Sequence, residues 1–305
     1  MQNKLMWGID LGGTKTEGVV MKGGDNPEII NRLRIPTERE KGYEHIINQI
    51  QKLLLKLEEE VSDKPSSVGI GIPGTLEPST RTVKNANTTV LNGKPFKDDL
   101  EKVLGLTVKL NNDANCFALA ESRFGAAKND AKNLSTIFGV IMGTGVGGGI
   151  IADNRILTGK QGIAGEWGHN FLDESGGKCY CGKTGCVETV ISGPALERYY
   201  QKISGNKKSL KEINKLHEGG MDEKASETIN RLCSFFGKAI AQVINIIDPE
   251  IVILGGGVGN INSFYTKGYD EAKKYVFNNK LETEFKKPLL GDSAGVIGAA
   301  YQVCT

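Results

Sequence analysis

A histidine and three cysteines form the densest group of potential metal ligands in the chain. His169 lies ten residues before Cys179, and Cys181 and Cys186 follow, so three cysteines fall within eight residues. One imidazole and three thiolates are the ligand set of a closed, tetrahedral zinc site. The spacing therefore predicts a structural zinc ion.

Two acids flank these ligands: Glu166 precedes the histidine by three residues, and Glu188 follows the last cysteine by two. A metal ion there would also fix both carboxylates in space. The alternatives are disulfides or cysteines that fill a core, but disulfides are typical of secreted chains, and this one begins without a signal peptide. Cys179 and Cys181 are also too close to bridge each other comfortably. The other cysteines are expected to be buried free thiols: Cys116, Cys233 and Cys304.

A glycine turn near the start of the chain could hold phosphate. Asp10 opens the run Asp-Leu-Gly-Gly-Thr-Lys, which ends at Lys15. The run lacks the spacing of a Walker A loop, but glycines at a hairpin turn let the backbone approach an anion, with a hydroxyl and a lysine beside it. Asp10, at the end of a strand, is placed to hold a magnesium ion directly or through water. An ordinary glycine hairpin would explain the run equally well if it stood alone.

A second glycine run begins at Gly143 and reads Gly-Thr-Gly-Val-Gly-Gly-Gly. It satisfies the G-x-G-x-x-G fingerprint of dinucleotide-binding proteins, which requires a helix next, whereas Ile150 and Ile151 read as a strand. A dehydrogenase is therefore disfavoured. Together with a third turn, from Gly255 to Gly257, the two runs fit a nucleotide held between domains better.

The candidate catalytic carboxylate is Asp113, in the run Asn-Asn-Asp-Ala-Asn that follows a strand and opens a helix. Asn and Asp are favoured helix N-caps, and capping alone would explain them. A cap at the carboxyl end of a strand is also where ligands of open α/β sheets collect, so both interpretations can hold. An ionised aspartate there would orient a hydroxyl and accept its proton, since phosphoryl transfer asks mostly for positioning and charge neutralisation.

The elements that must position these residues read as alternating strands and helices. Strands are expected at residues 5–9, 16–21, 29–35, 68–72, 107–110, 138–142, 150–151 and 251–254. Helices are expected at 43–60, from 112–113 to about 124, at 222–247 and at 295–303. Shifted by 131 residues, Gly12 falls on Gly143 and Gly18 on Gly149. This repeat predicts two similar domains, each of which opens with a hairpin.

Length and charge limit the class of protein. A chain of 305 residues suggests about two domains. The net charge is +2 with acids and bases interspersed, which gives no surface for nucleic acid or anionic membrane. No apolar run approaches the roughly 20 residues that would span a bilayer. These properties predict a soluble, cytoplasmic protein.

With these motifs assembled in order, the chain resembles the sugar kinases of the ROK family, which have the actin-like, ribonuclease-H-like ATPase fold. The resemblance extends nearly from end to end and rests on residues 8–15, 71–74, 111–116, 143–149, 165–169, 179–188 and 255–257. It implies an α/β fold of two similar domains with a cleft between them. The smaller domain would contain residues 1–115 and a C-terminal helix at about 292–305, and the larger one residues 116–291 with the zinc segment.

The resemblance also implies that ATP gives its γ-phosphate to the 6-hydroxyl of a hexose, with Asp113 as the general base. The hexose would be held by Gly74, Asn112, Asp113, Glu166, His169 and Glu188. ATP and its Mg²⁺ would be held by Gly8, Asp10, Gly12, Gly13, Thr14, Lys15, Gly143, Thr144, Gly145 and Gly147, with Gly255, Gly256 and Gly257 on the adenosine side. The structural Zn²⁺ would bind His169, Cys179, Cys181 and Cys186. One ring nitrogen of His169 would bind the metal, and the other would face the sugar.

Residues 83–87, 91–96, 165–170 and 179–183 look most like those of bacterial fructokinases with some activity on mannose, so fructose is the expected substrate. N-acetylglucosamine or glucose kinase of the same family is the alternative, since only a few contacts separate these sugars. A non-catalytic sugar-sensing regulator is disfavoured by Asp113, and a repressor by the lack of room for a helix-turn-helix before Leu5. A purely structural zinc protein would leave the glycine turns unexplained. The expected partners are a hexose, ATP and a second copy of the chain in a homodimer.

Overall fold

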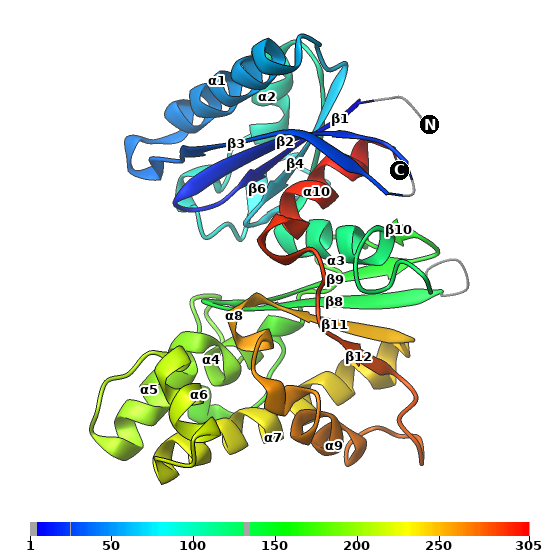
Figure 1. Cartoon of the computed structure of the whole chain (residues 1–305). Coiled ribbons are helices and arrows are strands. Elements are labelled where there is room, and N and C mark those ends of the chain that lie inside the picture. Colours follow the sequence, from blue (N-terminus) through cyan, green and yellow to red (C-terminus); the bar gives the residue numbers. More distant parts are fainter. Residues whose placement is uncertain (1–4, 25, 131–134, 305) are drawn as a thin grey trace. The chain divides into compact units, whose positions relative to one another are not determined.

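The computed structural model describes residues 5–24, 26–130 and 135–304 (Figure 1). The chain folds into two compact units. Unit 1 contains Met1–Asn133, Gly149–Ala164 and Leu289–Thr305, and unit 2 contains Leu134–Gly148 and Gly165–Pro288. The first domain was predicted to end at residue 115, within the helix that begins at Asp113. All of that helix belongs to unit 1.

Unit 1 is built on a five-stranded sheet with the order β3-β2-β1-β4-β7. Its strands are β1 (Leu5–Leu11), β2 (Lys15–Lys22), β3 (Glu28–Pro36), β4 (Ser67–Ile72) and β7 (Thr107–Asn112). The first three strands form an antiparallel meander, and β1, β4 and β7 run parallel. β1, β2 and β4 are buried over most of their length, which is expected because helices cover both faces of the sheet.

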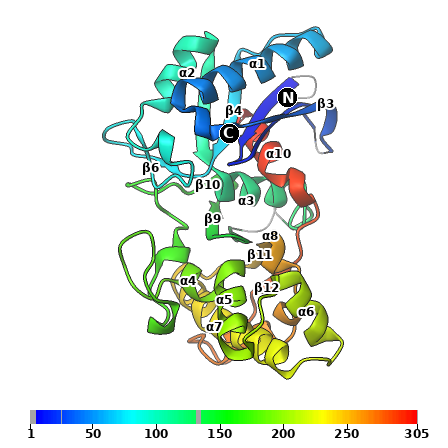
Figure 2. The ribbon, with the colours of Figure 1, turned by 90° about the vertical axis from the view of Figure 1, so that its left-hand side faces the viewer.

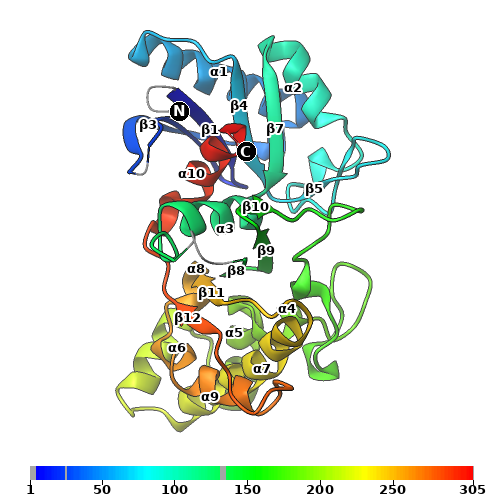
Figure 3. The same ribbon diagram turned by 90° about the vertical axis from the view of Figure 1, so that its right-hand side faces the viewer.

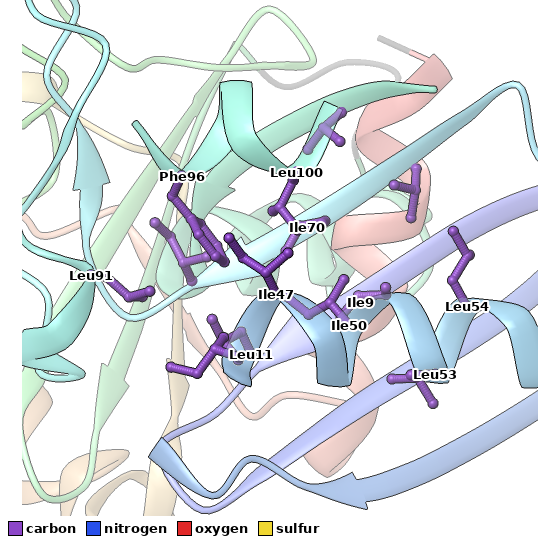
Figure 4. Packing of buried hydrophobic residues seen from close by; sticks show 14 of the residues in the cluster. Ile9, Leu11, Ile47, Ile50, Leu53, Leu54, Ile70, Leu91, Phe96 and Leu100 are labelled. Atoms are coloured by element: carbon purple, nitrogen blue, oxygen red, sulfur yellow. The ribbon is translucent and has the colours of Figure 1, made fainter. Parts of the chain in front are cut away.

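On one face, α1 (Tyr43–Val61) and α2 (Phe96–Leu104) pack against the sheet. The apolar residues of α1 recur at spacings of three and four, so that they form one buried stripe. Figure 4 shows this stripe packed against side chains of β1, β4 and α2 and against Leu91: Ile9, Leu11, Ile47, Ile50, Leu53, Leu54, Ile70, Phe96 and Leu100.

On the other face, α10 (Ala294–Tyr301) packs against β1, β4 and α3 (Asp113–Arg123), as Figure 3 shows. Glycines permit this close approach. A Cβ on Gly8 or Gly69 would overlap the backbone of α10, and one on Gly298 would overlap the backbone of Cys116. Small residues at the contact therefore let helix and sheet backbones touch.

The second sheet has the order β10-β9-β8-β11-β12. Its strands are β8 (Thr136–Met142), β9 (Val146–Ala152), β10 (Arg155–Ile156), β11 (Ile251–Gly255) and β12 (Glu284–Lys286). β11 runs parallel to β8 and β12, and β10 runs antiparallel to β9. Position by position this is the order of the first sheet, so the predicted duplication is confirmed.

Four helices of unit 2 (α4, α5, α6 and α9) pack against α7 (Glu223–Ile247), as Figure 2 shows for α4, α5 and α6, whereas α8 contacts β8 and β11. Their bounds are α4 (Val187–Ile191), α5 (Gly193–Ser204), α6 (Leu210–Glu218), α8 (Gly256–Gly259) and α9 (Lys267–Lys273). α7 begins at the N-cap Asp222, whose carboxylate accepts two backbone N–H groups, and it ends at Asp248, which has φ 42°.

The remaining elements are two short strands and several 3₁₀ turns. They are β5 (Thr75–Leu76), β6 (Val83–Lys84), η1 (Arg39–Lys41), η2 (Thr89–Leu91), η3 (Trp167–His169), η4 (Glu174–Gly176), η5 (Asn262–Phe264), η6 (Gly291–Ser293) and η7 (Gln302–Cys304). Among the residues that the structure describes, no helix is both long and apolar enough to cross a membrane.

Two expectations about the glycine runs were wrong. The second run is not a turn throughout, because β9 already begins at Val146 and takes Gly147, Gly148 and Gly149 into the sheet. The triglycine is likewise not a simple turn: Gly255 ends β11, and Gly256 and Gly257 begin α8. Glycine is required here because Gly256 has φ +79° and a Cβ on it would overlap the backbone of Met142.

Candidate active site

The cysteine segment of unit 2 is a compact turn held by its own backbone. The Cys179 N–H donates to the Lys183 carbonyl at 2.8 Å, and the Gly182 N–H donates to the Cys179 carbonyl at 3.0 Å. Gly182 has φ +88° and Gly185 has φ +74°, conformations that glycine adopts without strain. Because the turn is local, the spacing of the cysteines alone largely sets where their sulfurs lie.

The four predicted metal ligands converge. Their ligand atoms all lie within 4.8 Å of one another: His169, Cys179, Cys181 and Cys186. The sulfurs of Cys181 and Cys186 are 3.6 Å apart, and Cys179 Sγ lies 3.6 Å from His169 Nδ1. Zn–S bonds of about 2.3 Å in a tetrahedral site set sulfur ligands roughly 3.8 Å apart. The donor set and its spacing therefore fit a zinc ion, and Nδ1 is the ring nitrogen that faces the sulfurs.

The second ring nitrogen of His169 contacts Tyr180, a residue that was not among the predicted site residues. Nε2 lies 3.0 Å from the hydroxyl of Tyr180, and the two rings meet edge to face. Partial burial raises the pKa of Tyr180, and the charges of Glu188 and Glu166 raise it further, so the hydroxyl stays protonated. Its place between two cysteine ligands was the signal that could have identified Tyr180.

Glu188 connects the metal segment to the second glycine turn. It lies in the first turn of α4, and its carboxylate accepts the Val146 N–H at 2.9 Å. A Cβ on Gly145 would lie 2.6 Å from the same carboxylate oxygen. The acid expected to bind the hexose therefore also supports the turn expected to bind phosphate.

Glu166 is positioned by the residue that follows it. Trp167 is buried, its indole N–H donates to the Gly147 carbonyl at 3.0 Å, and its ring packs edge to face on Phe138. A Cβ on Gly148 would lie 2.8 Å from the indole. Gly147 and Gly148 thus serve the packing of Trp167, while Gly143, Thr144 and Gly145 form the turn itself.

In unit 1, Asp113 is the first residue of α3 and directly follows β7. Asn112 is the N-cap: its side-chain oxygen accepts the Ala114 N–H at 2.8 Å, and its amide donates to the Gly74 carbonyl at 3.3 Å. A Cβ on Gly74 would lie 2.8 Å from Ala86. The structure therefore brings together the predicted residues Gly74, Asn112 and Asp113, and the expected capping by Asn112 is confirmed.

Asp10 lies near the carboxyl end of β1 and Asp113 directly after β7, and both strands pair with β4. Burial raises the pKa of Asp10 to about 7, and the negative charges of Asp113 and Glu17 raise it further, against a smaller opposing effect of Lys15. Glycine α-carbons border the carboxylate, since a Cβ on Gly295 would lie 3.2 Å from it. A carboxylate in such a site is stabilised by a cation, which fits the expected Mg²⁺.

The first glycine turn is a tight hairpin in which the Gly12 N–H donates to the Lys15 carbonyl at 3.0 Å. Thr14 and Lys15 are exposed at its tip. Gly8 lies further from the turn, in the middle of β1, where it pairs with Val19 and packs on α10. Its role in the structure is packing.

A pocket of about 680 Å³ in unit 2 joins the second turn to the triglycine. It is lined by Gly143, Thr144, Gly193, Pro194, Glu197, Ser209, Leu210, Lys211, Asn214, Gly257, Val258, Asn260 and Ile261. The Gly193 N–H donates to the Gly143 carbonyl at 2.8 Å, which fixes α5 beside the turn. The residues from α5 and α6 were missed, although Ser209 and Glu212 form a capping box that marks the start of α6.

All six cysteines are free thiols. Cys116 and Cys233 are fully buried within α3 and α7, as expected, whereas Cys304 is only partly buried. Burial raises the pKa of Cys116, and so do the charges of Asp10 and Asp113. This thiol is therefore a neutral neighbour of the two aspartates.

Comparisons with known proteins agree with this geometry. The sequence profile described as the ROK family matches residues 6–305. The N-acetyl-D-glucosamine kinase of Vibrio atlanticus (strain LGP32) is 33% identical over 307 residues, which cover 97% of this chain and 99% of the relative. A ROK hexokinase from Thermus thermophilus has a TM-score of 0.85 at 29% identity, with 97% of both chains covered. A ROK family glucokinase from Streptomyces griseus, solved with glucose and AMPPNP, has a TM-score of 0.80 at 28% identity, covering 98% of this chain and 99% of that one.

Two sheets of equal strand order, each of which opens with a glycine hairpin, define the actin-like sugar kinase fold, and the predicted fold class is confirmed. The chain belongs to the ROK family. At the level of that family, the prediction of a sugar kinase is also confirmed.

Proposed function

We propose that this protein is an ATP-dependent kinase of a hexose 6-hydroxyl and that its preferred substrate is N-acetylglucosamine. The observation that carries the proposal is that Asp10, near the end of β1, and Asp113, directly after β7, lie at the same edge of the first sheet, on strands that both pair with β4. A carboxylate fixed beside a phosphate-binding turn can orient a hydroxyl toward the phosphorus.

In this proposal Asp113 accepts the proton of the 6-hydroxyl as its oxygen attacks the γ-phosphorus. The Ala114 N–H lies 2.8 Å from one carboxylate oxygen of Asp113, which fixes its orientation. Lys15 neutralises phosphate charge at the turn. Mg²⁺, bound through Asp10, would supply the remaining charge neutralisation.

Unit 2 contains the acids that we expect to bind the sugar and the pocket that we expect to bind the nucleoside. Glu166, His169 and Glu188 would accept or donate hydrogen bonds to sugar hydroxyls. A zinc ion bound through His169 Nδ1 would hold the imidazole in one orientation, which is its only role here. The pocket that Thr144 and Gly257 line has room for adenosine and continues from the phosphate turn.

N-acetylglucosamine is preferred to fructose because relatives that are 33% identical over 97% of this chain are N-acetyl-D-glucosamine kinases. The local likeness to fructokinases rests partly on residues 91–96, which serve the scaffold. Leu91 and Phe96 are fully buried, and the side chain of Asn92 makes two hydrogen bonds with the backbone of Ala86. Residues that build a loop say little about which sugar the protein binds.

The test is a coupled ADP-release assay with N-acetylglucosamine, glucose, mannose and fructose. The highest kcat/KM is expected for N-acetylglucosamine. A higher value for fructose would reverse the assignment, and sugar binding without ADP release from any of the four would indicate a sensing protein.

Asp113→Asn should lower kcat at least about a hundredfold and leave hexose affinity within a few fold, because base catalysis contributes about 10²–10⁴. Asp153→Asn is the matched control, since Asp153 is exposed in a turn with φ 48°, which asparagine tolerates. Unchanged turnover in Asp113→Asn would remove this residue from the mechanism. Calorimetric titration with the sugar separates binding from turnover.

A further inference from the structure

The loop between β3 and α1, residues 37–42, is hydrogen-bonded to the first glycine turn. The Thr37 N–H donates to the Thr14 carbonyl at 3.0 Å, and the Thr37 hydroxyl donates to the Gly12 carbonyl at 2.7 Å. The Thr16 hydroxyl lies 2.9 Å from that of Thr37, whose proton is already used, so Thr16 donates to it. Both threonines are fully buried. Three hydrogen bonds therefore fix where the loop begins relative to the turn.

Two residues further on, Arg39 lies against the same turn. A Cβ on Gly13 would lie 3.2 Å from Nη1 and 3.9 Å from Cζ of Arg39, so the guanidinium covers the α-carbon of Gly13. The chain bends just before this residue, where Glu38 has a left-handed backbone with φ 51°. Arg39 is nevertheless exposed, so its N–H groups can reach a ligand at the turn.

Arg39 forms no ion pair with the carboxylates that the structure describes. The carboxylate of Glu38 binds Lys41 at 2.6 Å and His45 at 2.8 Å. Across residues 5–24, 26–130 and 135–304, no carboxylate lies within ion-pair distance of Arg39. Lys41 is therefore paired within the loop, whereas the guanidinium of Arg39 lies beside the glycine turn.

A guanidinium presents planar N–H groups that match two phosphate oxygens, and a glycine turn lets a phosphate approach the backbone. Lys15 supplies a second cation at the same turn. We propose that Arg39 is a ligand of the terminal phosphates of ATP, an inference that rests on the proposed kinase function. Arg39 binds and orients the nucleotide before transfer, and it does not exchange protons with the substrate.

The test is equilibrium binding of ATP, ADP, AMP and adenosine, by calorimetry and without sugar, so that it does not depend on turnover. Arg39→Ala should weaken ATP binding at least about tenfold and leave adenosine binding within twofold, since hydrogen bonds between charged groups are the strong ones. Arg39→Lys, which keeps the charge but loses the planar fork, should fall between. Lys41→Ala is the matched control, because it removes the same charge from the same loop and should change ATP binding less than twofold.

Equal ATP affinity in Arg39→Ala and the unaltered protein would overturn the assignment, and so would equal weakening by Arg39→Ala and Lys41→Ala. Parallel losses for ATP and adenosine would also overturn it, since they indicate a disturbed pocket. If Arg39→Ala unfolds at a lower temperature than the unaltered protein, the ATP affinity of Arg39→Lys decides instead. Unaltered ATP affinity in Arg39→Lys would refute the need for the planar guanidinium. Failure of the unaltered protein to bind any of the nucleotides would overturn the proposed function as well.

Discussion

Replacing Asp10 with asparagine should stabilise the nucleotide-free protein at pH 8 while abolishing phosphate transfer. Burial raises the pKa of Asp10 from the ordinary 3.8 to about 7, helped by the charges of Asp113 and Glu17. Between those two values the unfolded chain has lost the proton and the folded chain still holds it. Stability therefore falls as pH rises from about 4 to 7, and the full penalty is present above pH 7.

The size of this loss of stability follows from the shift in the pKa of Asp10. A pKa of about 7 in the folded state implies a loss of about 2–3 kcal/mol between pH 5 and pH 8, at about 1.4 kcal/mol per pKa unit. The amide side chain of the variant does not ionise and carries no such penalty. The stability of Asp10→Asn relative to the unaltered protein should therefore rise by that amount over the same range.

Urea unfolding at pH 5 and pH 8, without Mg²⁺ or nucleotide, measures the difference. Tryptophan fluorescence reports on it, because Trp7 is buried in the same strand as Asp10 and Trp167 is buried in unit 2; a Trp167→Phe background leaves Trp7 as the reporter. Asp153→Asn, at an exposed turn, should show no such pH-dependent gain. A stability difference between Asp10→Asn and the unaltered protein that is equal at both pH values would refute a raised pKa at Asp10.

Three further results are expected. Cys186→Ser should lose zinc, as measured by elemental analysis, and lower Tm by several degrees, whereas Cys304→Ser should keep its metal content, because only Cys186 belongs to the cluster. Gly8→Ala should cost about 1–3 kcal/mol in urea unfolding, since its Cβ overlaps the backbone of α10, while Gly257→Ala, with open space around it, should be nearly neutral. Tyr180→Phe should lower the hexose KM about fivefold at unchanged zinc content, because it frees a ring nitrogen for the sugar; an unchanged KM would mean that the sugar does not use this nitrogen.

The features that could be predicted from the sequence are those set by short stretches of backbone. The thiolate cluster follows from a local turn, and the N-cap at Asn112 satisfies N–H groups within one helical turn. The helix at α1 follows from its apolar spacing. The repeat of the glycine hairpins also predicted two similar sheets. In the turn, the cap and the helix the interacting atoms lie close together along the chain, so residue type and spacing suffice, whereas the two sheets were predicted from the repeat alone.

Other features of the site were decided only by tertiary packing. Glu188 reaches the Val146 N–H because α4 begins beside the second glycine turn, and no spacing in the sequence indicates this. Arg39 covers Gly13 because Thr37 fastens a separate loop to the hairpin. Gly8 packs against α10, which lies nearly the whole chain away in sequence, and the glycine pattern around Gly8 does not indicate this contact. Such contacts depend on how sheets and helices pack, and packing is selected by burial of the whole core, so the local pattern of any one segment does not contain it.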